Sequence, residues 1–420
     1  MAKTLRGVKG TRDLLPPETA VWAAVERCAR RVFGLYGYDE IRTPVLEPTE
    51  LFVRGVGEAT DIVGKEMYTF EDRKGRNLAL RPESTAAVVR SFLQHRLEHG
   101  SLPARLFYVG PHFRYERPQK GRYRQFHQIG AELVGDPGPH SDAEMIAMLM
   151  RFLGALGLEG LEVQLNTVGD RESRAAYRAA LVAYLTPLAE RLGEESRRRL
   201  ETNPLRILDT KNPGERELLT GAPRLEDHLN TASREHFDDL RTLLTDLGIP
   251  HRVEPHLVRG LDYYSRTVFE IVAHGLGAQD AIVGGGRYDG LVAELGGPDL
   301  PAIGFAIGQD RLIESLGEDF RAGVEPTPPV LVLPMAPVSP RRGLRVAAEL
   351  RDAGIAATVE LGGTAIKTAL KRADRAGVRY VALLGEDELA AGGVALKDLK
   401  RGEQSFVAHA DLARRLEEMG

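Results

Sequence analysis

The stretch FYVGPHFRYERPQKGRYRQFHQIGAELVG, residues Phe107–Gly135, decides the fold that the sequence predicts. Both of its halves are rich in aromatic and branched side chains, which favour strands. The short segment RPQKG between them contains proline and glycine, which are typical of turns. The stretch therefore predicts an antiparallel hairpin.

Five side chains of this hairpin suggest a nucleotide site. Because side chains alternate along a strand, Arg114 and Glu116 share one face of the first strand. By the same rule, Phe126, Gln128 and Glu132 share one face of the second. Arginine suits a phosphate that gains charge, glutamate accepts from an exocyclic amine, and a phenylalanine face stacks on a base. Together they predict an ATP site, although an exposed hairpin with solvated charges remains the alternative for the hairpin alone.

The middle of the hairpin is basic and aromatic, which suits contact with nucleic acid. The residues concerned are Arg117, Lys120, Arg122 and Arg124, interleaved with Tyr115 and Tyr123. The net charge of −4 argues against a chain that coats nucleic acid non-specifically, so any such contact has to be local.

Two glycine-containing segments lie further along the chain. AIGFAIGQDRL predicts a strand that passes through Gly308 into a helix bearing Arg311, where glycine lets a ligand approach the backbone. LVRGLDYYSRTVFEI carries Arg259, Tyr263 and Tyr264, and VGGGRYDGL carries Tyr288. Taken singly, these segments are equally consistent with core strands, half-buried tyrosines and a glycine turn.

The remaining patterns predict the domain organisation. RPESTAAVVRSFL predicts a helix starting at Ser84, and residues 170–247 read as an inserted helical module. Residues 326–329 read as a stiff proline-rich linker. It separates a unit of residues 1–325 from an α/β domain of residues 330–420, in which strand and helix patterns alternate.

Composition excludes several classes of protein. Hydrophobic residues make up 43% and charged residues 28%, as in globular proteins. Cys28 is the only cysteine, so we expect no disulfide and no zinc or other metal site built from clustered protein ligands. The sequence contains neither a signal-peptide pattern nor a membrane-spanning apolar run, which predicts a cytoplasmic location without membrane association.

The motifs in combination resemble one family. VRGLDYY and GGGRYDGL, flanked by the arginine hairpin and GFAIGQDRL, resemble histidyl-tRNA synthetases, which are class II aminoacyl-tRNA synthetases. YGYDEIRTPVLEP, around Pro44, resembles the first class II motif, and the order of motifs matches along nearly the whole chain. The resemblance implies an α+β fold with an antiparallel-sheet catalytic domain, a helical insertion and a C-terminal α/β anticodon-binding domain. It also implies a homodimer that uses ATP with Mg²⁺, L-histidine and the histidine-accepting tRNA.

The resemblance also implies roles for individual residues. Arg114 and Arg259 would be catalytic, holding the α-phosphate and the histidine carboxylate. ATP would be bound by Arg114, Glu116, Arg122, Phe126, Gly308 and Arg311. Histidine would be bound by Glu83, Thr85, Arg114, Gln128, Glu132, Arg259, Tyr263, Tyr264 and Tyr288.

Two other functions share parts of this pattern. A catalytically silent, synthetase-like regulatory subunit of histidine biosynthesis shares the core, but Arg114, Arg259, Arg311 and the C-terminal domain argue against it. A module that senses uncharged tRNA within a larger protein would need an effector segment, and the sequence contains none. The sequence therefore favours the ligase.

Overall fold

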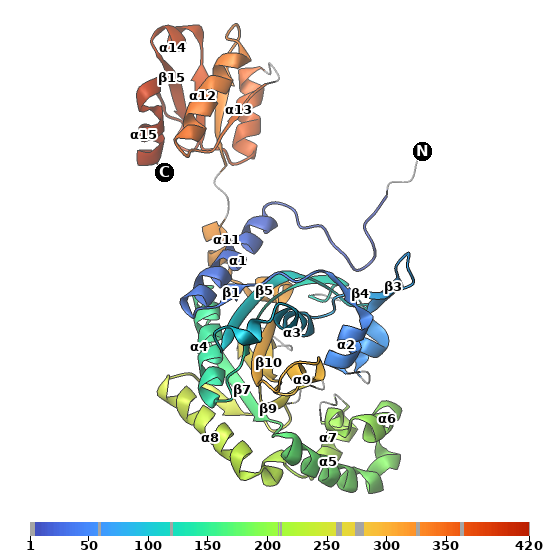
Figure 1. Cartoon of the computed structure of the whole chain (residues 1–420). Helices are drawn as coiled ribbons and strands as arrows, with labels where there is room; N and C mark the ends of the chain where they lie inside the picture. The colour runs from blue at the N-terminus through green and yellow to red at the C-terminus, as the bar shows by residue number, and fades with distance from the viewer. Residues whose placement is uncertain are drawn as a thin grey trace. The chain divides into compact units, whose positions relative to one another are not determined.

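The structure of the chain is a computed structural model that describes residues 5–57, 60–117, 121–208, 210, 212–257, 263–273, 281–324, 328–361 and 365–419 (Figure 1). The chain divides into two compact units, Met1–Val324 and Glu325–Gly420. No helix of the described residues combines the length and apolar character that crossing a bilayer requires.

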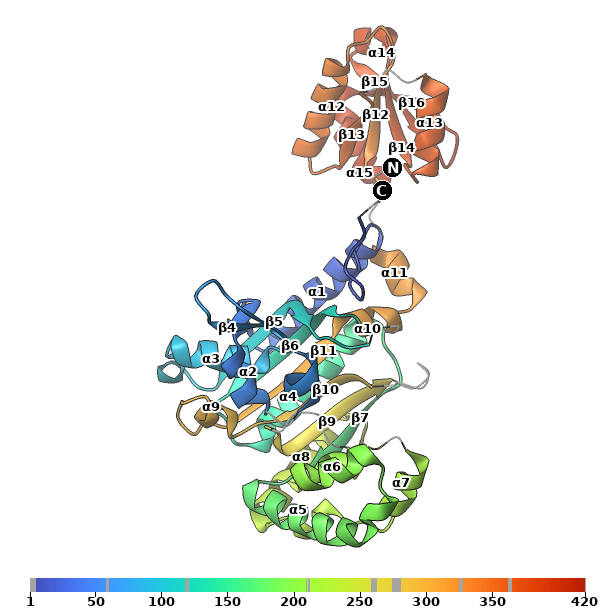
Figure 2. The same cartoon turned by 90° about the vertical axis from the view of Figure 1, so that its right-hand side faces the viewer.

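The first unit is built on an eight-stranded sheet with the order β1-β5-β6-β11-β10-β9-β7-β8 (Figure 2). Its pairs are antiparallel except for β1 with β5 and β7 with β8. The strands are β1 (Asp39–Glu40), β5 (Ala104–Phe113), β6 (Gln125–Val134), β7 (Leu161–Thr167), β8 (His251–Val253), β9 (Ser265–Ala273), β10 (Ala281–Arg287) and β11 (Ala302–Gly308).

The hairpin is present as β5 and β6, and its strands are shorter than the sequence predicts. They stop at Phe113 and Gln125, although the Arg114 N–H still donates to the Arg124 carbonyl at 3.0 Å across the pair. The Tyr115 N–H donates to the Glu66 carbonyl and the Arg124 N–H donates to the Gly10 carbonyl, each at 2.7 Å. Residues 118–120, which form most of the expected turn RPQKG, lie outside the described part. The described residues on each side of them are therefore held by other parts of the chain.

The two faces of the sheet differ as strand alternation requires. On β6, Ile129 and Leu133 are fully buried in the main core, which α1 (Glu18–Leu35), α4 (Pro139–Ala155) and α8 (Thr231–Asp246) cover from one side. The intervening residues of β6 point to the opposite face. That face is therefore available for a site.

Helix α3 (Thr85–Gln94) begins where the sequence predicts, with Ser84 at the N-cap position. The Ser84 side chain does not cap the helix, since its hydroxyl lies 2.7 Å from Nε2 of buried His112. Instead, the Glu83 carboxylate accepts from the N–H groups of Thr85 (2.7 Å) and Ala86 (3.1 Å). The cap thus fixes a buried carboxylate at the helix N-terminus.

The helical region after β7 has two parts. Phe237 and Leu240 of α8 belong to the main core under the sheet. The earlier helices surround a separate apolar cluster with Tyr177 and Leu181. They are α5 (Arg171–Leu185), η3 (Thr186–Arg191), α6 (Glu194–Thr202), η4 (Pro204–Ile207), α7 (Pro213–Leu219) and η5 (Leu225–His228). We call these six elements the helical module.

A buried charged cluster joins β10 to α4 and α8. Arg287, with a fully buried side chain, lies 2.7 Å from the Asp142 carboxylate in an ion pair whose atoms are not aligned as a hydrogen bond. Its guanidinium also donates to the carbonyls of Asp136 (2.9 Å) and Gly138 (2.6 Å). His236 lies 3.0 Å from the same carboxylate. The cluster fixes the end of β10.

Asp142→Ala is expected to lower the free energy of unfolding by about 3–5 kcal/mol, because it leaves the buried Arg287 charge with only the partly exposed Asp289 and removes the acceptor of the Thr267 hydroxyl. Urea unfolding of the full chain measures this loss. The control is Asp238→Ala, which removes an exposed ion pair with Arg241 on α8 and should cost less than about 1 kcal/mol. Equal losses for the two variants would contradict the assignment.

The first unit also contains smaller elements around the sheet. They are β2 (Leu46–Pro48), β3 (Tyr68–Glu71) and β4 (Asn77–Leu80), which form a three-stranded sheet, with α2 (Thr49–Val56), η1 (Ile62–Glu66), η2 (Leu97–His99), α9 (Leu291–Glu294), α10 (Gln309–Ser315) and α11 (Glu318–Val324). The segment β11–α10 is the strand and helix that AIGFAIGQDRL predicts.

The second unit is a five-stranded sheet of order β13-β12-β14-β15-β16 with its own apolar core. Its first three strands alternate with helices and pair in parallel, as the sequence predicts, and the last two pair in antiparallel fashion. The elements are β12 (Val330–Pro334), α12 (Pro340–Asp352), β13 (Ala357–Val359), α13 (Ile366–Arg375), β14 (Tyr380–Leu384), α14 (Glu386–Ala390), β15 (Gly393–Asp398), β16 (Gln404–Ala408) and α15 (His409–Met419).

Candidate active site

Two cavities adjoin on the open face of the large sheet. The larger has a volume of about 420 Å³ and the smaller about 150 Å³. Arg114, Gly284 and Ala306 line both. The cavities are therefore separated by a shared wall from the hairpin, β10 and β11.

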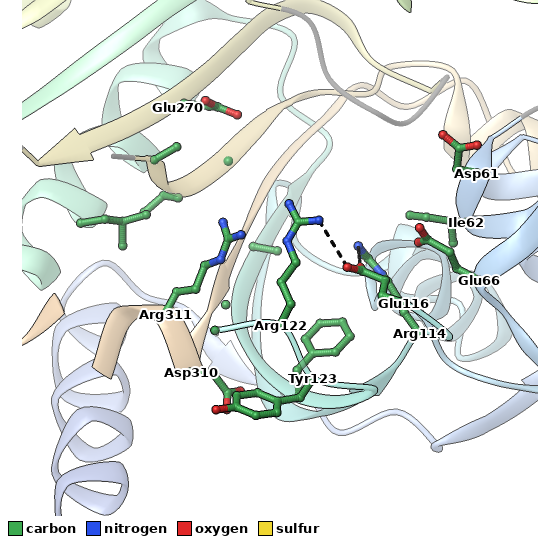
Figure 3. A pocket seen from close by; sticks show the side chains of 18 of the residues that line it. Asp61, Ile62, Glu66, Arg114, Glu116, Arg122, Tyr123, Glu270, Asp310 and Arg311 are labelled. Atoms are coloured by element: carbon green, nitrogen blue, oxygen red, sulfur yellow. Dashed lines mark hydrogen bonds and ion pairs between the residues drawn. The ribbon is translucent and has the colours of Figure 1, made fainter. Parts of the chain in front are cut away.

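The larger cavity is lined by all six residues for which the sequence suggested contact with ATP: Arg114, Glu116, Arg122, Phe126, Gly308 and Arg311. Figure 3 shows the side chains of Arg122 and Arg311 extending into it from different elements. Burial and the charge of Arg122 lower the pKa of Arg311. Two cations near enough for the charge of one to lower the pKa of the other are suited to a ligand with several negative charges.

Carboxylates also line this cavity: Figure 3 draws Asp61, Glu66 and Glu116 on one side and Glu270 on the side of Arg311. Burial raises the pKa of Glu66, and the charge of Glu116 adds to the effect. The walls of the larger cavity thus carry both carboxylates and guanidinium groups.

Arg114 is positioned by the segment before α3 and by the second strand. Its Nε–H donates to the Pro82 carbonyl at 2.9 Å, and its guanidinium carbon lies 5.3 Å from the Phe126 ring centre. A weak ion pair of 3.9 Å joins it to Glu116. Because one edge of the guanidinium is fixed, its terminal N–H groups occupy a defined place in the wall between the cavities.

The smaller cavity combines carboxylate, hydroxyl, amide and phenol groups. Its lining includes Glu83, Thr85, Tyr108, Arg114, Gln128, Tyr263, Tyr264 and Tyr288. The Tyr263 ring centre lies 4.8 Å from that of Tyr264 and 5.6 Å from that of Tyr288. The three rings thus form an aromatic wall of this small cavity, and the carboxylate, hydroxyl and amide groups line the rest of its polar surface.

Glu132 lies directly behind the lining of the smaller cavity and has no solvent exposure. Its two carboxylate oxygens accept from Thr85 Oγ1 (2.8 Å) and the Tyr288 hydroxyl (2.6 Å). Its opposite residue on β11 is Gly304, where a Cβ would overlap the carboxylate. Burial raises the pKa of Glu132 to about 8 despite these two hydrogen bonds. Among the described residues no cation is paired with this carboxyl group, which therefore keeps its proton to a higher pH than an exposed glutamate.

Gln128 provides a second unsatisfied group. Its Oε1 atom is buried and has no hydrogen-bond partner among the described residues, although the side chain lines the smaller cavity. A buried carbonyl oxygen without a partner is costly, so a ligand N–H donor at this place would be favoured. Glu83, which caps the N-terminus of α3, adds a further carboxyl group to this cavity. Its burial raises its pKa.

The structure brings together every suggested site residue that it describes, with Glu132 one layer behind the others. Arg259 lies outside the described residues. Sequence reasoning missed Tyr108, because a tyrosine inside a strand resembles ordinary core. It also missed Arg12, whose guanidinium donates to Asp310 (3.0 Å), the residue before Arg311. A single charged residue in an irregular segment belongs to no sequence pattern that would indicate a functional role.

Within the described ranges, no three His, Cys, Asp or Glu side chains are grouped as metal ligands.

Comparison with known proteins places this site in a family. The family model described as histidyl-tRNA synthetase matches residues 10–312, and the one described as anticodon binding domain matches residues 329–419. A histidine–tRNA ligase of Halorhodospira halophila is 52% identical over 403 residues, which cover 96% of this chain and 94% of that protein. One of Synechococcus sp. (strain JA-3-3Ab) is 48% identical over 412 residues, 98% of each.

A solved structure agrees with these sequence relatives. The apo S. aureus histidyl-tRNA synthetase superposes with a TM-score of 0.82 at 35% identity, covering 98% of this chain and 99% of that one. The α+β fold and the resemblance drawn from the motifs are thereby confirmed. The chain belongs to the histidyl-tRNA synthetase family.

Proposed function

We propose that this chain joins L-histidine to its cognate tRNA, using ATP and passing through a histidyl-adenylate. The observation that carries the proposal is the pair of adjoining cavities with Arg114 in their shared wall. One cavity offers guanidinium groups to a polyphosphate, and the other offers buried acceptors to a small cationic ligand. In this layout the reacting ends of the two substrates would meet at Arg114.

In the first step, a carboxylate oxygen of histidine attacks the α-phosphorus of ATP. The bond to the bridging oxygen breaks and pyrophosphate leaves. Negative charge grows on the phosphate oxygens, and we assign Arg114 and Arg259 to its stabilisation. Glu116 would accept from the adenine amine, Phe126 and Arg311 would enclose the ring, and Arg122 would contact phosphates. Mg²⁺ would arrive as part of the ATP substrate.

In the second step, a hydroxyl of the terminal adenosine of tRNA attacks the histidyl carbonyl, and AMP leaves. The exposed part of the hairpin, with Arg117 and Arg124, would meet the acceptor end. Residues 330–420 of the second unit would read the anticodon, and residues 326–329 would link them to the catalytic unit. Its match to the anticodon-binding domain supports this division.

Selection of histidine follows from the acceptors around the smaller cavity. Glu83, Thr85 and Gln128 would hold the α-ammonium group, while Glu132, Tyr263, Tyr264 and Tyr288 would surround the imidazole. An amino acid without ring N–H groups would leave these buried acceptors unpaired, which is a large penalty.

The family resemblance also supports a homodimer in the cytoplasm. The side chains of Leu46 and Phe70 in the three-stranded sheet are 46% and 44% exposed to solvent. Exposed apolar residues such as these would be covered in the interface with a partner subunit. Sedimentation of the purified chain would give the mass of a dimer, and a monomer at micromolar concentration would contradict this part of the proposal.

ATP–pyrophosphate exchange with each amino acid in turn tests the proposed reaction. Exchange is expected with histidine alone. Exchange with no amino acid would favour a regulatory subunit or a tRNA sensor, and exchange with a different amino acid would refute the histidine assignment. Arg114, Arg311 and the anticodon-binding unit support the ligase over the regulatory subunit.

A further inference from the structure

One arginine of the larger cavity comes from outside the motifs. Arg206 lies in η4 of the helical module, yet it lines the larger cavity together with Arg114 and Arg122. Its side chain is 20% exposed. The helical module therefore contributes a cation to a cavity whose other walls come from the hairpin, from β9 to β11 and from the segment around η1.

The contact that Arg206 makes with Asp61 is weak. The closest nitrogen and oxygen of the two side chains are 3.8 Å apart, which is an ion pair but too long for a hydrogen bond. Both side chains are partly exposed, and such pairs contribute about 0–1 kcal/mol. Breaking this pair would cost little.

Asp61 also has other cations. Lys65 lies 3.1 Å from its carboxylate and Arg199, from α6 of the helical module, lies 3.7 Å away. If Arg206 turned to another anion, Asp61 would keep both of these partners. A phosphate would give Arg206 shorter, charge-assisted hydrogen bonds than this ion pair does.

We propose that Arg206 binds the polyphosphate end of ATP and the pyrophosphate product, so that the helical module completes the ATP site. Asp61 holds the arginine beside the cavity while the site is empty. This inference rests on the proposed function, because it assigns a residue to the ATP of that reaction.

The experiment compares Arg206→Ala with Arg199→Ala in ATP–pyrophosphate exchange. Arg199 is a matched control, because it belongs to the same module and pairs with the same carboxylate but does not line the cavity. Arg206→Ala is expected to raise KM for ATP and for pyrophosphate about 10-fold or more, with KM for histidine unchanged. Arg199→Ala should change each KM less than about twofold, and Arg206→Lys should recover part of the loss.

Titration of the ATP-free protein with inorganic pyrophosphate gives a readout that is independent of turnover. Binding should weaken about 10-fold in Arg206→Ala and stay unchanged in Arg199→Ala. Equal effects of the two alanine variants would overturn the inference, since they would indicate only a structural role through Asp61. Unchanged pyrophosphate binding in Arg206→Ala would also overturn it. Neither result would contradict the proposed function, which fails only if the unmodified chain does not catalyse ATP–pyrophosphate exchange in the presence of histidine.

Discussion

Glu132→Gln is expected to lower kcat/KM for histidine in pyrophosphate exchange by about 100-fold, roughly 3 kcal/mol, and to leave KM for ATP unchanged. Thr85 and Tyr288 both donate to the carboxylate, so their oxygens retain lone pairs for a ligand N–H. The amide of glutamine would donate to one of these hydroxyls. That hydroxyl must then direct its own proton elsewhere, which opposes a donor on the ligand.

The same substitution is expected to stabilise the empty protein at alkaline pH. The pKa of Glu132 is raised to about 8, whereas a carboxyl of the unfolded chain has a pKa of about 4.3. Between these values the folded chain holds a proton that the unfolded chain has lost. The free energy of unfolding therefore falls as pH rises through this window, by about 1.4 kcal/mol per pH unit at most. Glutamine removes this slope.

Urea unfolding at pH 5, 7 and 9 measures the effect. The variant and the unmodified chain should have similar stability at pH 5, and the variant should be more stable by several kcal/mol, on the order of 4, at pH 9. Glu144→Gln is the control, because Glu144 is a partly exposed partner of Arg105 outside both cavities. A variant that activates histidine normally, or that keeps the same pH dependence, would contradict the role of Glu132.

Arg114→Ala should lower kcat of exchange by about 100- to 1000-fold, with smaller changes in KM for ATP and for histidine. The reason is that this guanidinium lies in the wall between the cavities, where charge develops during adenylate formation. Arg114→Lys should recover little activity, because an ammonium group cannot donate both to the Pro82 carbonyl and in a planar fork to the reacting phosphate.

Steady-state exchange and equilibrium binding of histidine separate the two effects of Arg114. The control is Arg105→Ala, which replaces an arginine that lines neither cavity and belongs to β5, the strand that ends just before Arg114. A loss confined to KM, with kcat unchanged, would mean that Arg114 binds substrates but does not stabilise the transition state.

The hairpin shows which features the sequence predicts well and which it does not. The strands and the common face of Gln128 and Glu132 follow from local alternation, a rule that needs no tertiary information. The ends of the two strands do not, because near them the Tyr115 N–H donates to Glu66 and the Arg124 N–H donates to Gly10. Those partners are distant in sequence, and no local pattern predicts them.

The residues of the candidate site also fall into those that the sequence predicts and those that it does not. Residues in motifs, such as Arg311 and Tyr288, are assigned because their neighbours are distinctive. Arg206 and Tyr108 are not, since a lone arginine in a helical module and a buried tyrosine in a strand have ordinary structural explanations. The start of α3 is an intermediate case, in which the position is predicted but the capping group, Glu83, is not.

The shared wall of Arg114, Gly284 and Ala306 has a thermodynamic consequence. A ligand in one cavity that shifts this wall changes the affinity of the other cavity. Linkage requires the change to be reciprocal, so the factor by which ATP alters the dissociation constant of histidine equals the factor by which histidine alters that of ATP. A substitution in the wall will therefore alter the cooperativity between the two substrates as well as each separate affinity.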